Sequence, residues 1–157
     1  MVAGSEIGTH FLLPGTLYAK PGVHRITTVL GSCVAICLWD QRRREGGMNH
    51  FKLPLWNGDG LPSPKFGNIA TEKLLENLLL MGCDRRQMQA KVFGGAAVLN
   101  HQSGLLNVGE RNIQVAMDML RQFKIPVTAQ DLGGEMSRKI VMDTSTGSIL
   151  MKRAKNA

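Results

Sequence analysis

The residues best suited to covalent chemistry in this sequence are one cysteine and one histidine, Cys33 and His50. A thiolate can attack a carbonyl carbon, and an imidazole can take the thiol proton and later protonate the leaving group. Cys33 follows Gly31 and Ser32, and such small residues let a substrate approach and let backbone N–H groups turn toward an oxyanion. The alternative to a catalytic role is that the two residues only pack in the fold, since a buried cysteine behaves as a small hydrophobic residue.

Metal and cofactor chemistry finds little support. Cys33, Cys37 and Cys83 cannot all pair with one another, so at least one thiol is free. Cys33, Cys37 and His50 could supply three zinc ligands, because positions four apart on a strand share a face, but a fourth ligand is not evident. The sequence has no phosphate-binding loop, dinucleotide-binding glycine motif or His-Glu-x-x-His motif. We expect neither metal nor cofactor.

The elements that must position these residues are short strands and two helices. Residues 23–30 and 34–39 are rich in β-branched and apolar residues, which predicts two strands or one strand with a sharp break. A polar turn over 40–46 and a strand over 47–53 complete a hairpin. Apolar periodicity predicts helices over 69–81, capped by Asn68 and ended by Gly82, and over 110–123. We expect an α+β fold, with mixed or antiparallel β-sheets packed as a sandwich and the two helices flanking it.

The hairpin itself raises a difficulty for the pair. A symmetric loop over 41–46 places His50 opposite Cys37, and Cys33 opposite Pro54. For Cys33 to reach His50, the strands must bulge, pair with other neighbours or leave Cys33 outside the ladder.

Length, composition and charge limit the function classes. The 157 residues predict a single domain over 1–157, with loose ends at 1–10 and 153–157. No apolar run approaches the roughly 18 residues of a membrane span, and the first 20 residues lack the pattern of a secretory signal, so we expect a cytoplasmic location. The net charge of +7 favours acidic partners, but scattered basic clusters and few aromatic residues do not favour nucleic acid.

Two segments around Cys33 and His50 carry a resemblance. Residues 30–40 read LGSCVAICLWD, and residues 46–54 read GGMNHFKLP, with Cys33 and His50 17 positions apart. These motifs and their spacing resemble the CheD family of chemoreceptor glutamine deamidases. The similarity spans about residues 12 to 152, and further matches are Lys91–Ala96, Gly109–Asn112, Asp131–Gly134 and Thr146–Gly147.

The resemblance implies a role for each residue of the site. Cys33 is the expected nucleophile, His50 the general base and acid, and Thr27 the third member, which orients the imidazole. If the strand is regular, Thr27 shares its face with Cys33 and Thr28 faces away, so Thr28 is the second choice. Gly31 and Ser32 are expected to provide the backbone of an oxyanion site. Val29 and Ser137 stand where the family commonly has glycine, and neither change touches the expected catalytic atoms.

The implied activity is the hydrolysis of glutamine side chains to glutamate on methyl-accepting chemotaxis receptors. The enzyme would be a protein-glutamine glutaminase that forms a thioester on Cys33, needs no cofactor or metal and supports chemotactic adaptation. The resemblance also implies the CheC phosphatase as a partner in some bacteria. The alternative is a non-catalytic adaptor that binds receptors or CheC, although an adaptor need not keep Cys33, His50 and Thr27. A nucleic-acid-binding module is a third hypothesis, and it predicts strongly salt-dependent binding.

Overall fold

The computed structural model describes residues 7–97 and 107–154. Within these ranges the chain forms nine strands, two α-helices and one short 3₁₀ turn at Arg85–Gln87. The strands are β1 Gly8–Phe11, β2 Thr16–Ala19, β3 His24–Leu30, β4 Val34–Asp40, β5 Glu45–His50, β6 Met88–Gly94, β7 Val127–Leu132, β8 Ser137–Asp143 and β9 Ser148–Ala154. The helices are α1 Gly67–Leu80 and α2 Val108–Gln122.

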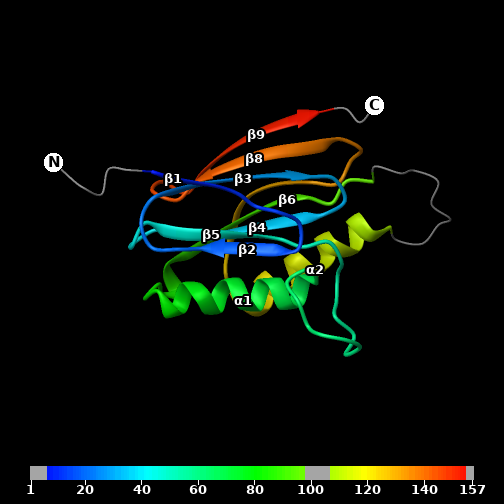
Figure 1. Ribbon diagram of the computed structural model, residues 1–157, viewed down its shortest axis with the longest axis horizontal. Helices are drawn as coiled ribbons and strands as arrows, with labels where there is room; N and C mark the ends of the chain where they lie inside the picture. The colour runs from blue at the N-terminus through cyan, green and yellow to red at the C-terminus, as the bar shows by residue number, and fades with distance from the viewer. Residues whose placement is uncertain (1–6, 98–106, 155–157) are drawn as a thin grey trace.

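The elements stack in three layers. A four-stranded sheet of order β1-β3-β8-β9 lies on a five-stranded sheet of order β2-β5-β4-β6-β7, and both helices cover the far side of the larger sheet (Figure 1). Each sheet contains one parallel pair, β1 with β3 and β6 with β7, among antiparallel ones. The α+β sandwich with two flanking helices expected from the sequence is confirmed.

Strand β4 is the centre of the larger sheet, and it separates two apolar cores. Its residues are buried on both faces, as expected of a strand covered by a sheet on one side and helices on the other. Val34, Ile36 and Leu38 point to the core beneath the helices. Ala35 and Cys37 point to the core between the sheets. Which core a side chain on or next to β4 enters therefore depends on which face of the larger sheet it lies on.

The hairpin β4–β5 turns earlier than the symmetric loop predicted. Asp40 pairs with Glu45, and Cys37 pairs with Met48. The turn closes early because the Asp40 carboxylate accepts hydrogen bonds from the backbone N–H groups of Arg42 (2.8 Å) and Arg43 (2.9 Å). The prediction that His50 lies opposite Cys37 is therefore wrong, and the true register is shifted by two residues.

The helices and chain ends also differ in detail from the expectations. Phe66, not Asn68, is the N-cap of α1, and the Asn68 side chain instead accepts from the Trp56 amide at 3.0 Å. Helix α1 ends before Gly82, which adopts a positive φ of 101°, as expected. Residues 8–10 and 153–154 are not loose, because they pair in β1 and β9. The other residues of the predicted loose ends, apart from residue 7, lie outside the described ranges.

In the part of the chain that the structure describes, neither helix is long and apolar enough to cross a membrane.

Candidate active site

Cys33 lies where the chain crosses from one sheet to the other. Strand β3 belongs to the smaller sheet and β4 to the larger one, so residues 31–33 form the crossing. The sequence left open two strands or one broken strand, and the structure shows two strands in different sheets. Cys33 is partly exposed and packs against the core between the sheets. A thiol at this crossing is held by both sheets yet remains accessible.

The carbonyl groups of this crossing loop are all held from one side. Gly31 O accepts from the Ala96 amide and Cys33 O from the Gly95 amide, each at 2.9 Å. Ser32 O accepts from the side-chain amide of Asn112 at 3.1 Å. Among the described residues, no acceptor is found for the backbone N–H groups of Ser32 and Cys33. Two amide donors next to a thiol are what a developing oxyanion needs.

The glycine pair after Phe93 allows this close approach. Gly94 and Gly95 have positive φ values of 108° and 74°, which disfavour other residues. A Cβ on Gly94 would run into the carbonyl of Cys33, and a Cβ on Gly95 would run into the side chain of Ile113. The sequence alone is equally compatible with a bulge or turn at Phe93–Gly95 and with a surface that the backbone of a substrate or partner approaches. The structure shows that the approaching backbone is the cysteine loop itself.

The register of β4 and β5 brings His50 near Cys33. The ladder Cys37 with Met48 continues as an isolated bridge between Val34 and Phe51, which places Cys33 one step further along, beside Lys52. His50 is thus a diagonal neighbour of Cys33 on the adjoining strand, a separation that long side chains can span. Both residues lie on the face of the sheet that points into the core between the sheets. No hydrogen bond joins them among the described contacts, and such bonds are often loose before substrate binds.

His50 takes its orienting contact from Thr28. The Thr28 hydroxyl lies 2.7 Å from His50 Nδ1, and it comes from β3 in the opposite sheet. Thr28 shares the inward face of β3 with the buried Ile26 and Leu30, whereas Thr27 lies on the outer face. The expectation that Thr27 orients the imidazole is therefore wrong in geometry. The resemblance implied Thr27, and its support from strand alternation assumed that β3 continues to Cys33, but β3 ends at Leu30.

The same contacts fix the tautomer of His50. The Thr28 hydroxyl also donates to the backbone carbonyl of Leu12 at 2.7 Å. A carbonyl can only accept and a hydroxyl has one proton, so Thr28 must accept its second hydrogen bond from His50 Nδ1–H. Nε2 of His50 then carries the lone pair. This nitrogen is buried and has no hydrogen-bond partner within the described ranges, so it is free to accept a proton.

Burial keeps both reacting groups uncharged. It lowers the pKa of His50 from 6.5 to about 4, and the positive charge of Lys52 adds to this effect. Burial also raises the pKa of Cys33, which is opposed in smaller part by Lys52 and by the backbone N–H of Cys33 itself. At neutral pH the pair is a thiol beside a neutral imidazole. An attack by this thiol would therefore require the imidazole to remove the thiol proton during the step, because the pair does not start as an ion pair.

The other two cysteines are less suited to attack. Burial raises the pKa of Cys37 to about 12, and its side chain is 2% exposed between the sheets. Burial and nearby carboxylates raise the pKa of Cys83 to about 11, and this residue packs under the helices at 6% exposure. Both behave as small apolar residues, so Cys33 is the best nucleophile of the three.

No group of three or more histidine, cysteine, aspartate or glutamate side chains that could hold a metal ion is found in residues 7–97 and 107–154. A zinc site from Cys33, Cys37 and His50 is not assembled there.

Sequence reasoning missed two groups of this site. In the sequence Asn112 is only the last residue of the Gly109–Asn112 motif, and no pattern points to the backbone carbonyl of Leu12. The signal for Asn112 was present, because it occupies the buried stripe of α2 together with Gly109, Ala116 and Leu120. A polar residue in such a stripe usually has a specific hydrogen-bonding role.

Comparison with known proteins gives a consistent picture. A family model described as CheD chemotactic sensory transduction matches residues 54–153. A protein of Trichlorobacter lovleyi, named as a probable chemoreceptor glutamine deamidase CheD, is 54% identical over 152 residues, which cover 97% of this chain and 94% of the relative. Proteins with the same name from Sulfurimonas denitrificans and Rhodospirillum rubrum are 53% and 42% identical, over 85% and 94% of this chain and 85% and 83% of the relatives.

The family model matches more than half of the chain, although its match begins after Cys33 and His50. The relatives add the N-terminal part, since the match to the first of them covers 97% of the chain. The chain therefore belongs to the CheD family.

Proposed function

We propose that this protein hydrolyses glutamine side chains of chemoreceptors to glutamate. The observation that carries the proposal is a partly exposed cysteine, Cys33, near a histidine whose Nε2 has no hydrogen-bond partner in the described ranges. The backbone N–H groups of Ser32 and Cys33 likewise have no acceptor among the described residues. The substrate class comes from the relatives, which are named chemoreceptor glutamine deamidases. The net charge of +7 suits an acidic protein partner.

The first half of the reaction forms a thioester. His50 Nε2 takes the proton of the Cys33 thiol, and Sγ attacks the carbon of the glutamine carboxamide. The carbonyl oxygen becomes an oxyanion, which the N–H groups of Ser32 and Cys33 stabilise. When the C–N bond breaks, His50 returns the proton to the leaving nitrogen and ammonia departs. Thr28 and the Leu12 carbonyl keep His50 in the tautomer that this step requires.

The second half releases glutamate. His50 Nε2 takes a proton from water, and the hydroxide attacks the thioester carbon. The C–S bond breaks, and the proton returns to the sulfur of Cys33. One glutamine and one water thus give one glutamate and one ammonia, with no change of oxidation state. The new carboxylates are potential methylation sites, which places the activity in adaptation of cytoplasmic chemotaxis signalling.

The direct test is to incubate the protein with the cytoplasmic fragment of a chemoreceptor and to map glutamine-to-glutamate conversion by mass spectrometry. We expect Cys33→Ala to abolish conversion, by a factor of at least about 10³. Cys37→Ala is the matched control, because Cys37 lies only four positions after Cys33 in sequence but is buried with its thiol protonated. This control should keep conversion.

The outcomes separate the competing functions. Loss of conversion in Cys37→Ala with conversion retained in Cys33→Ala would overturn the assignment of the nucleophile. Receptor binding without any conversion by the wild-type protein would favour a non-catalytic adaptor instead. Adding purified CheC phosphatase to the same assay tests it as a partner, because a complex that reaches the Cys33 loop should change the conversion rate.

A further inference from the structure

Asn112 joins the two segments that carry the reacting groups. It lies on α2 with no exposed surface. Its side-chain nitrogen Nδ2 donates to Ser32 O and to Lys52 O, both at 3.1 Å. Ser32 belongs to the loop of Cys33, and Lys52 follows the strand of His50. A single side-chain NH₂ group therefore ties the nucleophile loop to the end of the base-carrying strand.

The contact with Ser32 also fixes the direction of a donor. The carbonyl of Ser32 and the N–H of Cys33 belong to the same peptide unit, which is planar and trans, so they point in opposite directions. Since Asn112 holds the carbonyl toward α2, the N–H of Cys33 must point away from the helix. The N–H of Cys33 also opposes the rise in the pKa of the Cys33 thiol, as expected of a donor close to the sulfur.

The unused oxygen of Asn112 argues against a purely structural role. Asn112 Oδ1 is buried and has no hydrogen-bond partner among the described residues. A buried acceptor without a partner destabilises a fold, and an apolar residue of similar size would avoid this cost. The two carbonyl acceptors require the NH₂ end of the side chain to face them, which also fixes the orientation of the amide. The position thus uses asparagine for its donors.

We propose that Asn112 is a positioning residue that sets the Ser32–Cys33 peptide plane and thereby aims the Cys33 N–H at the oxyanion of the acyl-transfer step. This inference rests on the proposed function and names a further residue on which it depends. Asn112 touches neither the substrate nor the sulfur. It acts through the peptide unit, and its hydrogen bond to Lys52 keeps the His50 strand in register with the loop.

Two variants separate donation from packing. Asn112→Asp keeps the size of the side chain and removes both N–H donors, and Asn112→Ala removes the side chain. Gln114→Ala is the matched control, because it truncates an exposed amide two positions along the same helix. Circular dichroism gives the folded fraction of each variant, and if one variant fails to fold, the other still carries the test.

Four measured quantities separate a positioning role from a purely structural one. Acylation of Cys33 by p-nitrophenyl acetate forms an oxyanion, so its burst rate should fall about 10- to 100-fold in both variants, as should kcat for receptor deamidation. The KM for the receptor fragment should stay within about twofold. Alkylation of Cys33 by iodoacetamide forms no oxyanion, so its rate should stay within about threefold of the wild-type rate. Gln114→Ala should change none of these four quantities.

Equal losses of alkylation and acylation would show that Asn112 only supports the fold, and an unchanged acylation rate in Asn112→Asp would also overturn the proposal. The acylation test does not depend on the receptor. A wild-type protein that acylates but does not deamidate chemoreceptors would contradict the proposed function, while the selective loss of acylation in the Asn112 variants would still support the positioning role.

Discussion

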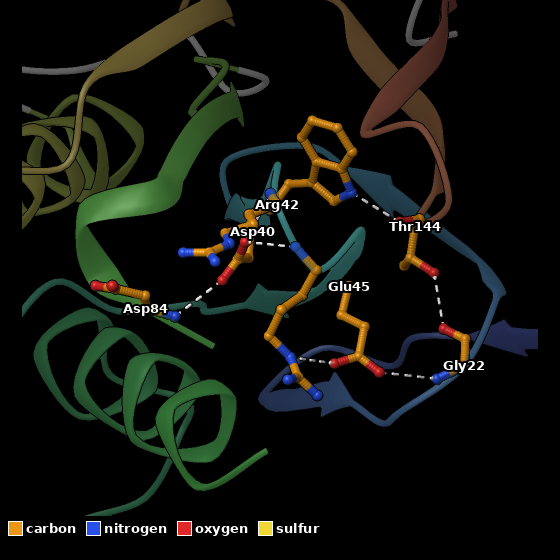
Figure 2. Close-up of polar contacts among 8 residues, drawn as sticks. Gly22, Asp40, Arg42, Glu45, Asp84 and Thr144 are labelled. Atoms are coloured by element: carbon orange, nitrogen blue, oxygen red, sulfur yellow. Dashed lines mark hydrogen bonds and ion pairs between the residues drawn. The ribbon is translucent and has the colours of Figure 1, made fainter. Parts of the chain in front are cut away.

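The two ends of the β4–β5 hairpin differ in how far their buried polar groups are hydrogen-bonded. At the turn, Asp40 is 1% exposed, and its carboxylate accepts from the amides of Arg42, Arg43 and Asp84. Figure 2 shows this carboxylate between the turn and the Asp84 amide, with Glu45 reaching toward Gly22 beside it. The indole N–H of Trp39 on β4 donates to the backbone carbonyl of Thr144 at 2.7 Å, which joins the same end of the hairpin to the smaller sheet. Polar groups here are thoroughly paired.

At the other end, polar groups remain unpaired. The buried side-chain atoms without partners in the described ranges are Asn49 Nδ2, His50 Nε2 and Asn112 Oδ1. All three belong to residues at or near the Cys33 end of the hairpin. Unpaired buried polar groups are costly, so their concentration at this end sets it apart from the turn. The comparison separates the end whose polar groups are paired from the end that carries the candidate site.

The largest expected effect on stability is at the turn. Asp40→Ala leaves three backbone N–H groups without their acceptor, so we expect the free energy of unfolding to fall by about 4 kcal/mol. Urea denaturation measures this loss. Asp59→Ala, in the exposed loop after β5, is the control and should change little. Because Asp40 is remote from the thiol, the folded fraction of Asp40→Ala should keep its kcat, and a large loss of kcat would contradict the division between the two ends.

A second effect is the dependence of stability on pH. The pKa of His50 is lowered from 6.5 to about 4 in the folded protein, so the unfolded chain takes up the proton first as the pH falls. The stability is therefore complete above pH 6.5 and declines between pH 6.5 and 4. We expect this group to account for about 2.5 kcal/mol of the decline by pH 4.5. Urea denaturation of the wild type and of His50→Gln at several pH values isolates this part, and parallel curves for the two proteins would contradict the burial of a neutral imidazole.

The smallest of the three effects distinguishes two neighbouring threonines. Thr28→Val removes the hydroxyl that accepts from His50 Nδ1, so kcat for deamidation should fall on the order of 10-fold. Thr27→Val makes the same change on the outer face of β3, and kcat should stay within about twofold of the wild-type value. Steady-state kinetics on the receptor fragment measures both. The reverse result would restore Thr27 as the orienting residue.

The sequence predicted the sandwich and both helices, because these depend on periodicity. The local motifs predicted Cys33 and His50 as a catalytic pair, and the register of the hairpin is compatible with that prediction. The predictions from sequence were wrong where a single side chain sets the path of the backbone. Asp40 closes the turn early, and this shifts the register by two residues relative to a symmetric loop. The resemblance implies Thr27, and the support from strand alternation requires the strand to continue to Cys33, whereas the chain changes sheets there. The role of Asn112 depends on α2 packing against two distant segments, which no local pattern contains.

The hydrogen bond from Thr28 to Leu12 has an acceptor that no substitution of Leu12 can remove. The acceptor is a main-chain oxygen, and every residue that could replace Leu12 carries the same oxygen. The hydrogen bond from the Leu12 amide to Thr27 O, at 2.8 Å, keeps that stretch of backbone in place. The tautomer of His50 thus depends, through Thr28, on where the backbone carbonyl of residue 12 lies. It does not depend on which side chain residue 12 carries. An alignment of sequences would show only a packing preference at position 12.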